Sequence, residues 1–249
     1  MLSFVQWKFF MHLQWTSSVG SHVGPKLVCG IEAPDKICNA GLKKPKTLFG
    51  NDGNLCHPWG ICCSRDGLIL AASGLSDRIV VYDKLGQFLY NFGKSGKQNG
   101  EFKCPTSVTC DSKNRVVVTD RSNHRIQIFN IKGEFLQKFG QIGSKAGELK
   151  SPWDVACNSH DCILVSDTGN HRIQLFDPNG QFIAKYELEG KKPRPKGVCF
   201  TPDDQIVVTD FKLHRLIVVA KDFTTAKYLV TVVGPKGSKY LKAKVKIFT

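Results

Sequence analysis

Two stretches of the sequence are nearly identical and decide the fold: TDRSNHRIQIF, Thr119 to Phe129, and SDTGNHRIQLF, Ser166 to Phe176. Each places an Asp, and then Asn-His-Arg, directly ahead of an alternating apolar run. A single Asp–His–Arg cluster would suggest catalysis, whereas a recurring one is typical of a structural repeat. How often the pattern occurs therefore decides between the two interpretations.

Three sequence markers recur in phase along the chain. The first is an arginine, 47, 47 and 43 residues apart, at Arg78, Arg125, Arg172 and Arg215. The second is a proline with the same intervals, at Pro58, Pro105, Pro152 and Pro195. The third is Gly-x-Phe, at Gly86–Phe88, Gly133–Phe135 and Gly180–Phe182. Three markers in phase establish a repeat of about 45 residues.

Each unit has the pattern of four short strands. In the second unit we predict strands at 107–111, 115–119, 125–130 and 135–139, rich in Val, Ile and Phe and separated by turn residues. Four strands in a unit of this length are the signature of a β-propeller blade. The predicted fold class is therefore all-β, with a propeller domain over residues 46–234.

The predicted blades lie at about 56–93, 103–140, 150–186 and 193–233, and Phe49-Gly50 resembles the end of an earlier blade. We expect residues 1–45 to be an irregular and poorly ordered segment, and 235–249 to be a basic tail. The first blade differs from the others, because Ser73 stands where the later blades have Asp, and Asp77 where they have His.

The composition favours a protein that stays inside the cell and meets an anionic partner. Thirty-five Lys and Arg against 21 Asp and Glu give a formal charge of +14, which favours nucleic acid or another anionic surface. The ten cysteines include no C-x-x-C pair, so we expect reduced thiols, no metal and no cofactor. The apolar N-terminus is interrupted by polar residues and is a poor signal peptide, so we expect a cytoplasmic protein without a membrane partner.

The units TDRSNHRIQIFNIKGEFLQKFG and SDTGNHRIQLFDPNGQFIAKY resemble NHL repeats, a family named for an Asn-His-Leu-like triplet that is Asn-His-Arg here. Over about residues 48–234 the chain is most similar to the C-terminal NHL propeller of tripartite-motif (TRIM-NHL) proteins of the heterochronic, developmental-timing kind. The resemblance implies a six-bladed propeller that binds stem-loop or single-stranded RNA and represses messenger RNA. Because four blades are recognisable, we expect an incomplete ring from a fragment or truncated form.

Full-length TRIM-NHL proteins carry RING, B-box and coiled-coil segments and are described as E3 ubiquitin ligases. The cysteine and histidine pattern of a RING or B-box does not precede the blades of this chain. Ligase chemistry is therefore not carried over, and equivalent Asp–His–Arg turns do not form the unique set of groups that a catalytic site needs. We expect no enzymatic activity in this chain.

The predicted binding face follows from the direction of the strands. Strands run alternately up and down, so the turns between second and third strands share one rim with the links that enter each blade. That rim carries a formal charge of +6, and the opposite rim is slightly negative. Cations with aromatic side chains suit phosphate neutralisation and base stacking. The predicted RNA-binding residues are Arg78, Arg121, His124, Arg125, His171, Arg172, Lys212, His214, Arg215, Trp153, Arg194 and Lys196.

The sequence leaves alternatives open for the roles of the repeat residues and for the kind of partner. The repeat Asp, such as Asp167, is expected to accept hydrogen bonds from backbone N–H groups of its own turn. The repeat arginines either pair with this Asp or reach a ligand, and Trp59 and Trp153 either stack on bases or pack between blades. The expected partner is messenger RNA, through stem-loop or U-rich elements of 3′ regions. The alternative is a protein-interaction or substrate-docking module of a TRIM-type E3 ubiquitin ligase.

Overall fold

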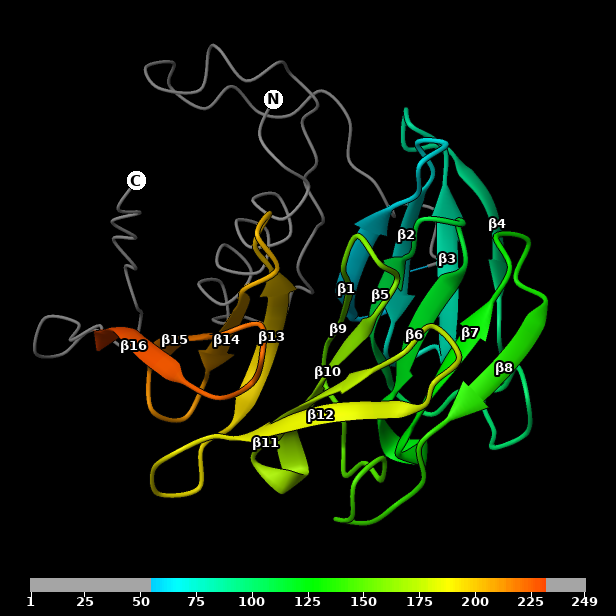
Figure 1. Ribbon diagram of the computed structural model, residues 1–249. Helices are drawn as coiled ribbons and strands as arrows, with labels where there is room; N and C mark the ends of the chain where they lie inside the picture. Colours follow the sequence, from blue (N-terminus) through cyan, green and yellow to red (C-terminus); the bar gives the residue numbers. More distant parts are fainter. Residues whose placement is uncertain (1–54, 232–249) are drawn as a thin grey trace, which may run out of the picture.

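The computed structural model describes residues 55–231, and these form sixteen strands in four antiparallel sheets (Figure 1). The predictions for the N-terminal segment 1–45, for Phe49-Gly50 and for the tail 235–249 lie outside the described residues. The all-β fold class with four propeller blades is confirmed. A six-bladed ring stays a prediction, because residues 55–231 hold four blades.

Each blade is a four-stranded meander in which the strands pair in sequence order. Blade 1 holds β1 (Pro58–Cys63), β2 (Ile69–Ser73), β3 (Arg78–Tyr82) and β4 (Phe88–Phe92). Blade 2 holds β5 (Pro105–Cys110), β6 (Val116–Asp120), β7 (Arg125–Phe129) and β8 (Phe135–Phe139). Blade 3 holds β9 (Val155–Cys157), β10 (Ile163–Asp167), β11 (Arg172–Phe176) and β12 (Phe182–Glu187). Blade 4 holds β13 (Pro195–Phe200), β14 (Ile206–Asp210), β15 (Arg215–Val219) and β16 (Ala226–Thr231).

The first strands of the blades form the inner wall of the propeller. β1 packs against β5, β5 against β9, and β9 against β13, whereas the fourth strands such as β4 and β8 lie on the outside (Figure 1). Two single-turn 3₁₀ helices, η2 (Arg121–Asn123) and η3 (Thr168–Asn170), fill the turns between the second and third strands of blades 2 and 3. The turn and the entering link of one blade therefore lie together, as the backbone bond from Gly169 N–H to Lys150 O at 2.8 Å shows.

The predicted strands of blade 2 agree with the structure within two residues. The largest difference is the start of β5, which begins at Pro105 because this proline pairs with Asp120 ahead of a register shift. A proline is accepted at the first position of a strand, where no N–H is needed for the ladder. Similar register shifts follow Pro58 in β1 and Pro195 in β13. Bulges of this kind re-aim the side chain that follows the proline.

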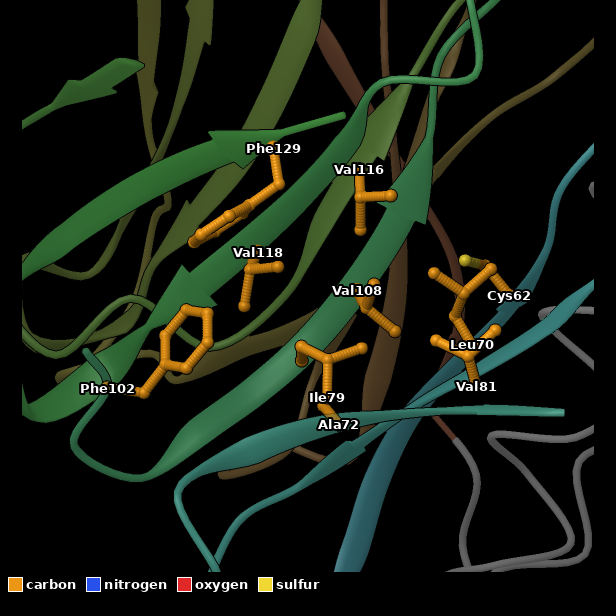
Figure 2. Packing of buried hydrophobic residues seen from close by; sticks show 10 residues of the cluster. All are labelled: Cys62, Leu70, Ala72, Ile79, Val81, Phe102, Val108, Val116, Val118 and Phe129. Atoms are coloured by element: carbon orange, nitrogen blue, oxygen red, sulfur yellow. The ribbon is translucent and has the colours of Figure 1, made fainter. Parts of the chain in front are cut away.

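The hydrophobic core lies between neighbouring blades. Figure 2 shows the cluster between blades 1 and 2, where Ile79 of blade 1 lies beside Val108 of blade 2 and Leu70 and Phe129 belong to opposite ends of the same cluster. Two further clusters fill the spaces between blades 2 and 3 and between blades 3 and 4. Each buried Val, Leu, Ile or Phe side chain contributes about 1.5–3 kcal/mol relative to an exposed one. A blade therefore depends on its neighbours for most of its stability.

Gly60 allows the inner strands of blades 1 and 2 to approach closely. A Cβ at this position would lie 2.5 Å from Ser107 Cα and 2.9 Å from Thr106 O, which are backbone atoms that cannot rotate away. We expect Gly60→Ala to lower the free energy of unfolding by about 1–3 kcal/mol, the usual cost of overpacking. Urea denaturation followed by circular dichroism measures this change.

The control for this substitution is Gly74→Ala. A Cβ on Gly74 would lie 3.4 Å from its nearest neighbours, which is close to ordinary contact. We expect it to cost less than half of what Gly60→Ala costs. Equal losses in the two variants would contradict the close approach of β1 to β5.

Candidate functional site

The side chain that ends the second strand of each blade fixes the link that enters the same blade. In all four blades it accepts a hydrogen bond from a backbone N–H of that link. The pairs are Ser73 with Cys56, Asp120 with Lys103, Asp167 with Lys150, and Asp210 with Arg194, at 2.8, 2.8, 2.7 and 2.9 Å. The prediction that the repeat Asp binds its own turn is thus incomplete, because its main backbone partner lies 16 or 17 residues earlier.

The repeat arginines of blades 2 and 3 point into the protein. Arg172 is 2% exposed, and its Nε donates to Asp167 Oδ2 at 2.8 Å. Its terminal nitrogens donate to the carbonyl oxygens of Ser144, Lys145 and Glu148. Arg125 is 6% exposed and binds Asp120 Oδ2 at 2.7 Å in the same manner. Guanidinium groups committed to a buried carboxylate and to backbone carbonyls are not available to phosphate.

Of the two alternatives for these arginines, the geometry therefore favours the one in which they lock the turn. The inclusion of Arg125 and Arg172 among the RNA-contacting residues is corrected for this reason. Arg215 has a similar arrangement, with Nε 3.1 Å from Asp210 Oδ2. Arg78 lacks an acidic partner at Ser73, and its Nε donates to Ser76 O at 3.1 Å.

The histidines that precede these arginines occupy a left-handed backbone position. Asp77, His124, His171 and His214 have φ values of 52°, 56°, 62° and 51°, a conformation in which Asp and His are enriched. His124 Nδ1 accepts a hydrogen bond from Ser151 N–H at 2.9 Å, and Asp77 Oδ1 accepts one from Cys104 N–H at 2.7 Å. Both donors belong to the link that enters the next blade. Asp77 and His124 therefore fasten neighbouring blades to one another.

Five residues from all four blades meet at the rim where the inner strands begin. We call this set, Trp59, Arg121, Trp153, Lys196 and Phe211, the cation–aromatic cluster. The ring centroids of Trp59 and Trp153 lie 4.4 Å apart. Lys196 Nζ lies 3.8 Å from the centroid of Trp153 and 4.2 Å from that of Phe211. Arg121 Cζ lies 5.0 Å from the centroid of Trp153. The geometry is that of several cation–π contacts around one indole ring.

The cluster brings together positive charges that are partly buried. Removal from water, followed by the charges of Arg194 and Arg121, lowers the pKa of Lys196 to about 8. Each of these cations raises the energy of the others, so an anion placed among them relieves the repulsion. Arg194, Lys212 and His214 are exposed on the same rim. The arrangement is suited to binding an anionic ligand that also offers flat apolar groups.

Sequence reasoning missed Phe211, although a signal for it exists. Phe211 is equivalent in the repeat to Gly74, Arg121 and Thr168, directly after the side chain that ends the second strand. Trp59, Thr106, Trp153 and Lys196 occupy a second equivalent position, directly after the repeat proline. Residue type changes from blade to blade at both positions, while their neighbours recur. Variable positions within a constant framework are where one blade can differ from another in what it binds.

Within residues 55–231 no group of three or more His, Cys, Asp or Glu side chains is placed to hold a metal ion. The same part of the chain contains no helix long and apolar enough to cross a membrane.

Comparison with known families identifies the repeat. The model for the NHL repeat matches residues 102–129 and 149–176, which hold the first three strands of blades 2 and 3. These two segments thus match the NHL repeat, and the fold that contains them is a β-propeller.

The resemblance to TRIM-NHL proteins is also confirmed. E3 ubiquitin-protein ligase TRIM71 of Xenopus tropicalis is 43% identical over 82 residues, which are 28% of this chain and 10% of the relative. Protein lin-41 of Caenorhabditis elegans is 43% identical over 51 residues, 19% of this chain and 4% of the relative. RING finger protein nhl-1 of the same organism is 36% identical over 62 residues, 23% of this chain and 6% of the relative. The matched segments thus span a tenth or less of these relatives.

Solved structures support the fold alone. A streptogramin B lyase superposes with a TM-score of 0.57 at 16% identity, over 70% of this chain and 56% of that chain. A chain of the nidogen/laminin complex superposes with a TM-score of 0.56 at 20% identity, over 72% of this chain and 65% of that chain.

The role of Arg172 as a structural lock can be tested by its removal. We expect Arg172→Ala to lower the free energy of unfolding by about 3–5 kcal/mol, because it leaves the buried Asp167 carboxylate without its cation. Arg194→Ala, which removes an exposed side chain, should change stability by about 0.5 kcal/mol or less. Urea denaturation of the three proteins gives the comparison. Similar small losses in both variants would refute the lock.

The bond from Ser151 N–H to His124 predicts a pH dependence of stability. Burial, followed by the charge of Arg121, lowers the pKa of His124 in the folded protein below the value of about 6.5 that it has in the unfolded chain. Between these two pKa values the unfolded chain therefore binds more protons than the folded protein. The stabilisation is complete above the unfolded value and is lost as pH falls below it. We expect Tm to fall between pH 7.5 and 5.5 by more in the parent than in His124→Asp.

The Asp substitution is a matched control, since Asp77 already accepts the equivalent bond in blade 1. Its carboxylate stays charged throughout this pH range and keeps accepting the Ser151 N–H. Thermal melting at four pH values checks the difference. Parallel curves for parent and variant would show that His124 is not the responsible group.

Proposed function

We propose that this propeller binds RNA on the rim that carries the cation–aromatic cluster. The observation that carries the proposal is the convergence of Arg121 and Lys196 on the Trp153 ring, next to the 49% exposed Phe211. RNA-binding surfaces combine cations for the phosphate backbone with aromatic faces for unpaired bases. Arg194 and Lys212 extend the positive surface beyond the cluster.

The roles of the cluster follow from its exposure. Lys196, Arg121 and Arg194 neutralise phosphates, and the exposed ring of Phe211 stacks on an unpaired base. Trp153 is held between the cations and Trp59, so it positions charge rather than receiving a base. The ligand is a stem-loop or U-rich element of messenger RNA, and binding represses that messenger in the cytoplasm. The similarity to the TRIM-NHL relatives supports a binding module of this general kind.

A second candidate function is docking of a protein partner along the outer strands. Leu89, Leu136 and Ile183 are exposed on β4, β8 and β12 at equivalent positions of three blades. Such a series would suit the substrate- or partner-docking part of a ubiquitin-ligase complex, as the names of the relatives suggest. Crosslinked partners that are recovered equally well after ribonuclease treatment would favour this candidate over RNA.

Loss of two cations from the cluster should weaken RNA binding and reduce its salt dependence. We expect parent binding to a U-rich single strand in the micromolar range, and a tenfold or greater loss in Arg121→Ala plus Lys196→Ala. The slope of log Kd against log salt should become shallower by about 1.4, since each phosphate contact contributes about 0.7 for single strands. Fluorescence anisotropy at several salt concentrations measures both quantities.

Two control variants separate the roles. Lys84→Ala plus Lys113→Ala removes the same charge from exposed turns of the opposite rim and should leave affinity nearly unchanged. Phe211→Ala should reduce affinity by about 1–3 kcal/mol without changing the salt slope, because stacking releases no counterions. The proposed face is wrong if the opposite-rim variant loses as much affinity as the cluster variant.

A further inference from the structure

We propose that Cys62 and Cys110 are a redox modification site, at which a peroxide produces a reversible disulfide between blades 1 and 2. The two sulfur atoms lie 3.7 Å apart, although the residues are 48 positions apart in the sequence. Cys62 lies in β1 and Cys110 ends β5, so the bond would join two inner strands directly. The disulfide would form whether or not the rim binds RNA.

The close approach of the strands accounts for the contact between the sulfurs. Gly60 brings β1 against the backbone of β5, and Cys62 follows two residues later on the same strand. Cys62 belongs to the core cluster between the blades, where Figure 2 shows its sulfur near Leu70 and Val81. Cys110 is partly buried and packs against the same cluster. A disulfide needs a separation of about 2.05 Å, so the sulfurs have to approach by about 1.7 Å.

The pairing is specific to this interface. At the equivalent positions of the next two interfaces the sequence has Thr109 with Cys157, and Ala156 with Phe200. Cys63, the neighbour of Cys62, is exposed, because successive side chains of a strand point to opposite faces. Of the three blade interfaces within residues 55–231, the one between blades 1 and 2 therefore has a cysteine at both of these positions.

The exposure of the two thiols sets the order of the chemistry. Cys62 is 5% exposed, whereas Cys110 is accessible enough to meet a small oxidant first. The Cys110 thiolate attacks hydrogen peroxide, so that an S–O bond forms, the O–O bond breaks, and hydroxide leaves with a proton as water. The Cys62 thiolate then attacks the Cys110 sulfur, the S–S bond forms, and the S–O bond breaks to release a second water.

The reaction balances as two thiols and one peroxide giving one disulfide and two waters. Two equivalents of a thiol such as glutathione reverse it, so the bond is transient in a reducing compartment. Its structural effect is to fix blade 1 to blade 2. The same two strands begin at the rim with Trp59 and Thr106, so the disulfide would hold the inner wall together below the cation–aromatic cluster.

The test is oxidation of the full chain in its native state. The reduced protein is treated with one equivalent of hydrogen peroxide, remaining thiols are alkylated in denaturant, and peptides are mapped without reductant by mass spectrometry. We expect a peptide pair joined through Cys62 and Cys110 that lacks two hydrogens and separates on addition of dithiothreitol. Tandem fragmentation between the adjacent residues distinguishes Cys62 from Cys63. Oxidation should also raise Tm by roughly 5 °C or more.

Four variants make the assignment specific. Cys62→Ser and Cys110→Ser should lose both the linked peptide and the rise in Tm. Cys63→Ser and Cys157→Ser, which change the neighbour and the blade 3 equivalent, should keep both. If Cys62→Ser does not fold, Cys110→Ser and the peptide map of the parent still decide the question. A link through Cys63, or no link at Cys110 in the native parent, overturns the proposal.

Discussion

A buried carboxylate at the end of the second strand is the interaction on which blades 2, 3 and 4 depend. Asp167 is 0% exposed and accepts hydrogen bonds from the entering link, from the turn, and from the third strand. An ion removed from water is tolerated only when such partners surround it. The link, the turn and the third strand must therefore assemble around the carboxylate together, which explains why Asp, Asn, Arg and Gln recur as one set in blades 2 and 3.

Contacts at both rims then determine how one blade sits against the next. At the rim of the cluster, His124 accepts a bond from the link of blade 3. At the opposite rim, Asp161 accepts bonds from the backbone and hydroxyl of Ser112 in the preceding blade. Between the rims, valine and isoleucine side chains pack in buried hydrophobic clusters. These contacts fix the position of each blade relative to the next. Residues from all four blades can therefore meet at the ring of Trp153.

The residues that hold the blades together are therefore different from the residues that vary at the rim. The Asp and Arg side chains of blades 2 and 3, together with His124, are committed to bonds inside the framework. The positions after the proline and after the Asp are left to vary. Arg121 and Lys196 occupy such positions and lie against Trp153, and Phe211 occupies another and lies against Lys196. A site made of unlike residues from equivalent positions is suited to recognising an extended ligand across several blades.

The sequence by itself determined the repeat, the four blades, the strand positions and the positive rim, because these follow from spacings of 47 and 43 residues and from strand alternation. It could not decide the direction of Arg125 and Arg172, since both a buried Asp and solvent lie within reach of a flexible side chain. It also could not show that Phe211, Lys196 and Trp153 touch. That contact depends on the bulges after the prolines and on the packing of inner strands, which bring together residues that are distant in the chain.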